Sequence, residues 1–394
     1  MQISSLAARG ALEAGVGRPR PWLGRAGLKA ATNRVGGLVA FGLLPALATV
    51  ALIAITFGKG SLLYDFHGGL YQAGRDVLHG RSPYRPGYLA LQAAIQRAGG
   101  APATVIDVPV YPAPILLAVV PFALLPYHVA ALVFTALSVA GLLMALRLLG
   151  VRDWRCYGVA FCYWPVLSGL RLGAVSPLLV LGAAIAWRRR DDLRACTTAL
   201  AAVIVAKLFP WTLAVWLVFT RRWRALLVTA GLAAALTLGA WAAIDFRGLS
   251  EYPAMLSNLS SVSAPVGVSA VSGALALGAS TAPGLALADA LAAGLLALAW
   301  RASREPGGEG RAFGLIVIAA LTASPMVWPH YLALLVIPIA LLSPRLSPIW
   351  FVPLVAYVAP IDQTGAAKWE VLPYLVIEAL VVWRLVRPVE PACR

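Results

Sequence analysis

Charged residues are scarce in this sequence, and their scarcity argues against a soluble protein. Only 12% of the 394 residues are charged, whereas 60% are hydrophobic. A typical soluble domain has about 25% charged residues, so this chain could not cover a surface that faces water. Many apolar runs reach the roughly 20 residues that a membrane-spanning helix needs. The composition therefore predicts an all-α, polytopic membrane protein whose main solvent is the lipid bilayer.

Acidic residues are also few, which leaves a formal net charge of +16. Such an excess of basic residues could indicate nucleic-acid binding. Here, however, the basic residues form short clusters between apolar runs rather than a stripe on a soluble surface. Cytoplasmic loops of membrane proteins are enriched in Lys and Arg. We therefore interpret the clusters as determinants of membrane topology and expect no nucleic-acid partner.

Cysteine is nearly absent, and familiar cofactor motifs are missing. The four cysteines form neither a CxxC pair nor a metal-ligand spacing. The sequence contains no GxGxxG, P-loop or HExxH motif. Asp191 and Asp192 lie within an arginine cluster, where a local charge pair is the simpler interpretation than a metal site. We expect no metal site, no cofactor and no nucleotide-bound substrate, although a requirement for a metal ion stays open.

The order of basic, apolar and polar segments predicts the topology. Residues 1–34 form a basic tail that we place in the cytoplasm. A single membrane domain follows over about 35–390. Its first helix is expected near 36–57, followed by a long first external loop at about 58–110. A second, Ser/Gly-rich external loop is expected at about 245–283.

The remaining apolar runs predict about 11–13 membrane helices in all. These runs lie at about 111–126, 127–149, 156–187, 195–220, 225–244, 285–302, 312–326, 328–343, 347–361 and 371–387. The two at 156–187 and 195–220 each lie between basic clusters, so each is interpreted as a hairpin that returns to the cytoplasm. The tips of these hairpins would carry Arg171 and Lys207 to the outer side.

Four ionisable residues beside or within the apolar runs are candidates for function, because such groups are costly near lipid. Asp65 follows the first helix and could act as a general base, or it could merely cap a helix or form a salt bridge in the loop. Arg171 and Lys207 would suit a lipid phosphate, or could extend toward lipid headgroups without a specific ligand. His330 could bind phosphate or belong to an interfacial aromatic belt with its neighbours Trp328 and Tyr331.

Four motifs, in this order along the chain, resemble glycosyltransferase family 87. They are Asp65-Phe66-His67-Gly68-Gly69-Leu70-Tyr71 continuing to Leu78-His79-Gly80-Arg81-Ser82-Pro83-Tyr84; Tyr111-Pro112-x-Pro114; Lys207-Leu208-Phe209-Pro210; and Ser324-Pro325-x-x-Trp328-x-His330. Two positions depart from the family pattern. The first hairpin tip reads Gly173-Ala174-Val175-Ser176 and lacks the usual Gln, and Pro329 stands where the family has Asp. These departures leave the sugar and the acceptor open.

The resemblance implies a fold of the GT-C type and a hexosyltransferase activity. The family moves a sugar, commonly mannose, from a polyprenyl-phosphate donor to a lipid or glycan acceptor on the outer face of the cell membrane. Asp65 is then the expected base of an inverting reaction. Arg171, Lys207 and His330 are the expected ligands of the donor phosphate. Candidates for contacts to the acceptor, or for shaping the first loop, are Tyr71, Arg75, Asp76, Arg81 and Tyr84.

A transporter or flippase of a lipid-linked or anionic solute is the alternative function. Transporters more often carry their charges near the middle of helices and show repeats across two halves. The sequence shows no internal repeat, and its candidate residues fall at predicted outer ends. This pattern favours chemistry at the membrane interface.

Overall fold

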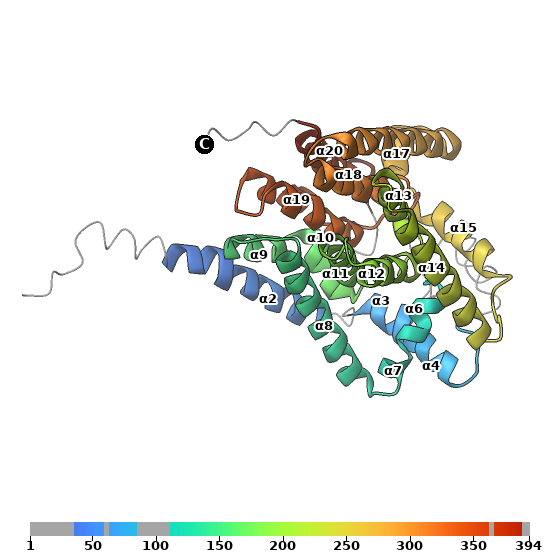
Figure 1. Ribbon diagram of the computed structural model, residues 1–394. Helices are drawn as coiled ribbons and strands as arrows, with labels where there is room; N and C mark the ends of the chain where they lie inside the picture. Colours follow the sequence, from blue (N-terminus) through green and yellow to red (C-terminus); the bar gives the residue numbers. More distant parts are fainter. Residues whose placement is uncertain (1–34, 59–62, 85–110, 362–365, 388–394) are drawn as a thin grey trace, which may run out of the picture.

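The computed structural model describes residues 35–58, 63–84, 111–361 and 366–387. Within these ranges the chain forms helices and no strand, which confirms the predicted all-α class. The basic tail of residues 1–34 lies outside the described residues, as does the 85–110 part of the predicted first external loop. Figure 1 shows the arrangement of the helices, with α2 beside α9 at one side and α17, α18 and α20 together at another.

The N-terminal half of the chain forms the first group of helices, which includes the first hairpin. They are η1 (Val39–Leu43), α2 (Leu44–Gly58), α3 (Tyr64–Phe66), η2 (His67–Gln72), α4 (Ala73–Leu78), α6 (Ala113–Ala118), α7 (Val120–Ala123), α8 (Tyr127–Leu148), α9 (Trp154–Phe161), α10 (Trp164–Leu172), α11 (Ser176–Arg188) and α12 (Leu193–Ala206). Prolines stand in the first turns of α6, α7, α10 and α11, where a missing backbone N–H costs no helical hydrogen bond.

The C-terminal half adds a second group of helices. They are η3 (Phe209–Thr212), α13 (Leu213–Phe219), α14 (Trp223–Ala243), α15 (Tyr252–Ser263), α16 (Ala270–Ala276), α17 (Thr281–Arg304), α18 (Glu309–Thr322), η4 (Pro329–Leu335), α19 (Val336–Leu342), η5 (Pro348–Val358), η6 (Lys368–Val371) and α20 (Leu372–Val386). The helices η3, η4, η5 and η6 are short 3₁₀ segments, whereas η1 and η2 are π-helical.

Four helical segments of the described residues are long and apolar enough to cross a membrane. They are Val35–Leu52, α8, α14 and α17, and the bent pair of α10 and α11 makes a fifth if it counts as one span. The protein is thus a multi-pass membrane protein by the length and composition of its helices. The number is smaller than the predicted 11–13, because several apolar runs fold as short helices of 10–17 residues.

Both predicted hairpins are broken at the expected residues. The axes of α10 and α11 differ by 115°, and α10 ends at Gly173, whose φ of +67° is the left-handed conformation that favours glycine. The second break falls between α12 and η3, at Lys207, whose backbone is extended. Arg171 and Lys207 therefore do stand at the two tips.

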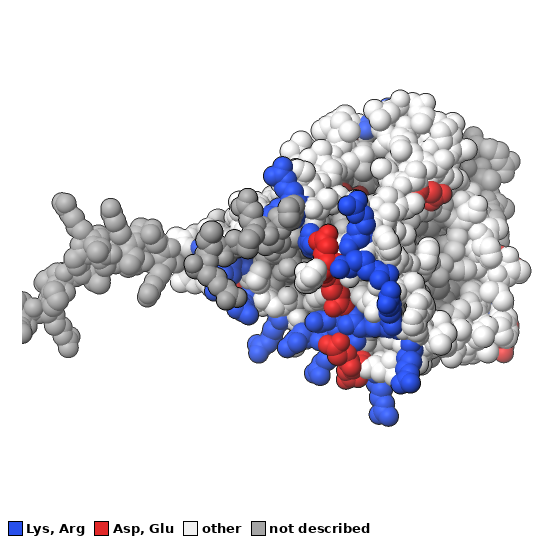
Figure 2. Space-filling model, turned by 45° about the horizontal axis from the view of Figure 1, so that its top comes forward, with Lys and Arg blue, Asp and Glu red and all other residues white. Residues whose placement is uncertain are grey.

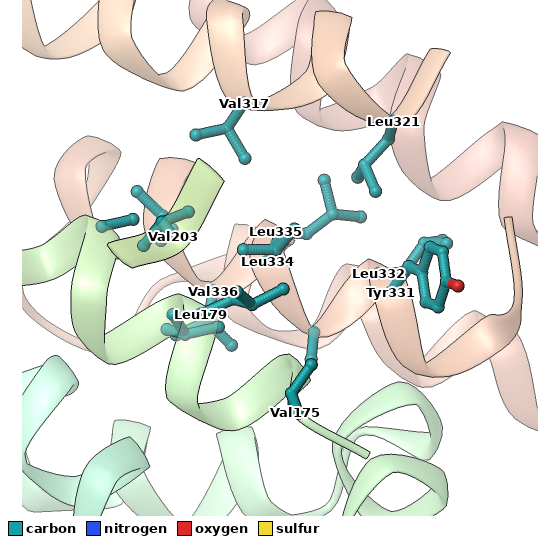
Figure 3. Packing of buried hydrophobic residues seen from close by; sticks show 14 of the residues in the cluster. Val175, Leu179, Val203, Val317, Leu321, Tyr331, Leu332, Leu334, Leu335 and Val336 are labelled. Atoms are coloured by element: carbon teal, nitrogen blue, oxygen red, sulfur yellow. The ribbon is translucent and has the colours of Figure 1, made fainter. Parts of the chain in front are cut away.

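The core is centred on α18, which is buried on all sides from Ala312 to Thr322. Figure 3 shows how Val317 and Leu321 of this helix face Leu334 and Leu335 of η4. Val175 and Leu179 of the first hairpin lie on the other side of the same segment. A helix that is apolar all round must be enclosed by other helices. The segment of residues 329–342 is therefore held at the centre of the molecule.

The predicted Ser/Gly-rich loop at 245–283 is not irregular, because it contains α15 and α16. Ser269 caps α16: its side chain accepts a hydrogen bond from the Ser272 backbone N–H, and the Ser272 hydroxyl in turn accepts from the Ser269 N–H. Such a reciprocal capping box satisfies N–H groups that a helix start leaves free. Val268 N–H also donates to the Val327 carbonyl, which ties the segment to the residues before η4.

Basic side chains gather on one face of the molecule, as Figure 2 shows. Many arginines stand at the ends and connections of helices, namely Arg147, Arg152, Arg155, Arg188, Arg189, Arg190, Arg194, Arg221, Arg222, Arg224, Arg301, Arg304, Arg311, Arg345, Arg384 and Arg387. Three of these connections are joined by ion pairs. Glu309 at the start of α18 pairs with Arg190 and Arg222, and Arg222 also pairs with Asp191 at 3.2 Å.

Candidate active site

A short helical turn positions Asp65 directly after the first long helix. Leu63 begins this turn with a φ of 56°, and its backbone N–H donates to the Arg171 carbonyl at 2.8 Å. The neighbouring Phe66 is fully buried, and its ring stacks on Phe134 with centroids 4.5 Å apart. These two anchors fix the backbone on both sides of Asp65, so the carboxylate projects from a segment that is held in place.

Gly173 permits the close approach of the Asp65 segment to the first hairpin. A Cβ atom at this position would lie 2.6 Å from the Cβ of Phe66 and 3.0 Å from a methyl group of Leu63. No side chain fits at these distances, and the positive φ of Gly173 disfavours one independently. The hairpin tip and the Asp65 turn can therefore touch through their backbones only because this residue is glycine.

His330 faces Asp65 across the site. Its Nε2 atom lies 3.8 Å from Oδ2 of Asp65, which is beyond the distance of a direct hydrogen bond. The imidazole is 5% exposed, and its Nδ1 has no hydrogen-bond partner among the described residues. The Asp65 side chain is 28% exposed, so the carboxylate is the member of this pair that a ligand can reach.

Lys207 occupies a pocket of aromatic rings. Its Nζ lies 3.7 Å from the centroid of the Tyr331 ring and 5.2 Å from that of Tyr111. Phe209 stacks on Tyr331 with an interplanar angle of 6°. A buried ammonium over aromatic rings gains cation–π energy that partly replaces its lost hydration. Lys207 also lies close enough to Asp65 for their charges to interact.

Arg171 completes the group of predicted residues. It stands in the last turn of α10 and is 6% exposed. Its charge and that of Lys207 both act on His330. The four residues that the sequence singled out near the apolar runs are therefore brought together by the fold, although they are separated by up to 265 positions along the chain.

The candidates in the first loop, apart from the exposed Arg75, make structural contacts. The Tyr71 hydroxyl donates to the Leu125 carbonyl at 2.9 Å. Asp76 is 8% exposed and forms an ion pair with Arg81 at 2.8 Å. Arg75 is exposed on α4. In these contacts the side chains hold the loop segment together.

Tyr84 supports the site indirectly. Its ring stacks on Trp241 with centroids 5.2 Å apart, and burial raises the pKa of its hydroxyl above the usual range. The protonated hydroxyl donates to the Tyr111 carbonyl at 2.8 Å. Tyr84 thus helps to position Tyr111, which in turn faces Lys207.

Two residues that line the site, Tyr111 and Tyr331, are not among the functional residues that the sequence predicts. Tyr111 belongs to one of the four motifs and Tyr331 to the predicted aromatic belt, but neither is predicted to line a site. Tyr111 lies against Gly69, where a Cβ would come within 3.3 Å of its ring. Aromatic residues beside a proline or a histidine are common in membrane proteins, so no signal in the sequence identifies these two rings as a lysine pocket.

Two short helices, α11 and α12, separate the site from the arginines of the basic face. The site stands at the N-terminal end of α11 and the C-terminal end of α12, whereas the arginines of the basic face lie at their opposite ends. These helices have 13 and 14 residues, which corresponds to a length of about 20 Å each. Both helices are shorter than a hydrocarbon layer, which is about 30 Å thick.

The described residues contain no group of three His, Cys, Asp or Glu side chains that could hold a metal ion. The chemistry available to the site from its own residues is that of one carboxylate, one imidazole and two cations. Such a group can accept a proton and stabilise negative charge on a phosphate.

Fold and site together define a multi-pass membrane protein in which two buried cations lie beside a carboxylate. The family model of glycosyltransferase family 87 matches residues 110–329, more than half of the chain. The chain belongs to glycosyltransferase family 87 and is a membrane glycosyltransferase. No curated protein and no solved structure matches it. The matched range contains Arg171 and Lys207, while Asp65 and His330 lie outside it.

Proposed function

We propose that this membrane glycosyltransferase moves a hexose from a polyprenyl-phosphate donor to a hydroxyl of a lipid or glycan acceptor, with Asp65 as the general base. The observation that carries the proposal is the position of Asp65. Its partly exposed carboxylate lies beside two buried cations, Arg171 and Lys207. In a membrane protein, a lipid-linked phosphate is a substrate whose charge suits such a place.

The reaction that suits this arrangement is a single displacement. Asp65 removes the proton from the acceptor hydroxyl, and the oxygen attacks the anomeric carbon of the sugar. The bond from that carbon to the phosphate oxygen breaks, and its electron pair leaves with the phosphate. Attack opposite the leaving group inverts the anomeric configuration. Because phosphate is already a good leaving group, the reaction needs less acid catalysis than glycoside hydrolysis does.

Charge develops on the departing phosphate, and the cations of the site are positioned to stabilise it. Arg171 offers a planar guanidinium that can bind phosphate oxygens in pairs. Lys207 supplies a point charge that the rings of Tyr111 and Tyr331 hold in place. We propose His330 as a third ligand of the phosphate, and its contact with Asp65 also lets it orient the base.

The sugar, the fold type and the side of the membrane are inferred from the family resemblance and from the topology. Mannose is the sugar that the resemblance favours, and a GT-C-type arrangement is the fold that it implies. The basic face, at the opposite ends of α11 and α12 from the site, supports a cytoplasmic location for that face and for the N-terminus. The site then opens to the external side of the cell membrane.

The test is transfer of labelled mannose from polyprenyl-phosphate-mannose to a membrane lipid extract by the protein in nanodiscs. Asp65→Asn should lower the rate by about 1,000-fold, within the range that general base catalysis supplies. Asp245→Asn is the matched control, because Asp245 is exposed and pairs with Arg247 at 3.0 Å; its rate should equal that of the wild type. Equal rates for Asp65→Asn and the wild type would remove Asp65 from the mechanism.

The alternative of a transporter makes a different prediction for the same preparation. A transporter or flippase would move the lipid-linked sugar between leaflets of a liposome without changing its mass. Mass spectrometry of the recovered lipids distinguishes the two functions. Movement of unchanged donor, with no glycosylated product from any lipid-linked sugar offered, would replace the transferase with the transporter.

A further inference from the structure

The basic face contains a group of arginines that have no part in the proposed glycosyl transfer site. Five exposed arginines lie in two neighbouring connections, and we refer to them as the basic patch: Arg188, Arg189 and Arg194 around the α11–α12 connection, and Arg221 and Arg224 around the α13–α14 connection. No residue that the structure describes forms an ion pair with any of the five. The acidic neighbours of the patch, Asp191 and Asp192, are already engaged. Asp191 pairs with Arg222, and Asp192 accepts the Ala195 N–H at the start of α12.

Ion pairs of Glu309 with Arg190 and Arg222 hold the two connections together. Glu309 accepts from Arg222 and pairs with Arg190, and each arginine lies over a tryptophan ring, at 5.0 Å for Trp216 and 4.7 Å for Trp187. Because Arg190 and Arg222 use their charges here, they brace the surface rather than add to its free charge. The two connections are thus held side by side, and the five arginines of the patch have no ion-pair partner among the described residues.

Two exposed apolar side chains adjoin these arginines. Trp223 is 54% exposed between Arg222 and Arg224, and Leu193 is 44% exposed next to Arg194. A small soluble anion such as inorganic phosphate offers nothing for these apolar side chains to contact. The combination of exposed apolar side chains with unpaired arginines suits the boundary of a bilayer, where indole rings lie at the depth of the headgroups and arginines reach the phosphates.

We propose that the basic patch, with Trp223 and Leu193, is a binding site for the phosphate headgroup of an anionic phospholipid. The guanidinium groups bind the phosphate, and the two apolar side chains contact the upper part of the acyl chains. This lipid lies at the ends of α11 and α12 remote from Asp65, so it is distinct from the donor. The inference does not depend on the proposed transfer reaction.

The test measures lipid binding to the full-length protein in a neutral detergent by native mass spectrometry. The probes are short-chain phosphatidylglycerol, short-chain phosphatidylcholine and glycerol phosphate. The wild type should bind phosphatidylglycerol more tightly than phosphatidylcholine and should not retain glycerol phosphate. The double variant Arg189→Gln/Arg224→Gln should bind phosphatidylglycerol roughly 25-fold more weakly, because each arginine near an anionic headgroup contributes about a fivefold gain. Both residues are exposed and unpaired among the described residues, so the unfolding midpoint should not change.

The matched control removes the same charge from another part of the basic face. Arg152 and Arg345 are also exposed, and the Arg152 backbone N–H donates to the Pro344 carbonyl, which places them together. Arg152→Gln/Arg345→Gln should change the affinity by less than about threefold. Equal losses in the two double variants would show diffuse attraction without a site. Retention of glycerol phosphate as tight as that of the lipid, or no preference for phosphatidylglycerol, would also overturn the proposal.

Discussion

The two ends of α11 and α12 carry charged residues in opposite environments. At one end Arg171 and Lys207 are 6% and 9% exposed, and they lie beside Asp65 and His330. At the other end the arginines of the basic patch are exposed and unpaired among the described residues. A buried charge requires a fold built around it, whereas an exposed one can be changed at little cost. The difference separates charged residues that the fold encloses from charged residues that it leaves on the surface.

After Asp65→Asn, replacing Lys207 should have the largest effect. Lys207→Gln removes a cation that stabilises the departing phosphate, so kcat/KM for sugar transfer should fall about 100-fold. Lys207→Arg keeps the charge and should recover part of this loss. Lys368, which is exposed at the start of η6, is the matched control, and Lys368→Gln should retain wild-type activity. Similar rates for Lys207→Gln and Lys368→Gln would contradict the assigned role.

The contact at Gly173 should show how much the buried end depends on backbone geometry. Gly173→Ala places a methyl group against Phe66 and Leu63 and also strains a residue with positive φ. The free energy of unfolding should fall by roughly 2–3 kcal/mol, measured as a lower unfolding midpoint in detergent.

Gly150 separates backbone strain from steric contact. Its φ is +85°, and no atom lies within 4 Å of the point that a Cβ would occupy. Gly150→Ala should cost only about 1 kcal/mol, from backbone strain alone. If both alanine variants unfold at the same temperature, the close approach at Gly173 is not a constraint on the site.

The ion pairs of Glu309 should affect stability without affecting catalysis. Glu309→Gln removes the carboxylate that serves both Arg190 and Arg222, and we expect a loss of roughly 1–2 kcal/mol. Glu305, which pairs with Arg311 but is 53% exposed, is the control, and Glu305→Gln should cost under about 0.5 kcal/mol. Thermal unfolding measures both losses. A large fall in transfer rate at unchanged stability would contradict a purely structural role for Glu309.

The smallest effect should be a pH-dependent one at the cap of α9. Asp153 accepts hydrogen bonds from Arg155, which lower the pKa of its carboxyl to about 2. A lowered pKa stabilises the fold above the ordinary pKa of aspartate, near 4, and this stabilisation disappears as the pH falls toward 2. Asp153→Ala should therefore cost about 1 kcal/mol at pH 7, and less with each step below pH 4. A cost that is the same at pH 7 and pH 3 would exclude this explanation.

The membrane class and the hairpin tips could be predicted from the sequence because these features depend on local composition. Arg171 and Lys207 are isolated charges between arginine clusters, and a chain that returns to the same side must turn near them. The described residues form fewer long helices than the apolar runs predict. Proline and 3₁₀ segments such as η4 and η5 turn apolar runs into short helices, which hydropathy alone does not reveal.

The arrangement within the site could not be predicted, because it depends on contacts between distant segments. The aromatic pocket of Lys207 combines Tyr111 and Tyr331, and Glu309 meets Arg222 from 87 positions away. The helices α15 and α16 escape prediction for another reason. Their Ser- and Gly-rich composition resembles a loop, and only the Ser269/Ser272 capping box indicates a helix start.

The site residues are far apart in the sequence, so the ribosome makes them at different times. Asp65 emerges from the ribosome and reaches the membrane long before Arg171, Lys207 and His330 are made. The backbone contact from Leu63 to Arg171 cannot form until the first hairpin has inserted, and the imidazole opposite Asp65 arrives only with the last fifth of the chain. No portion of the nascent chain that ends before residue 330 can therefore hold all four residues of the candidate site.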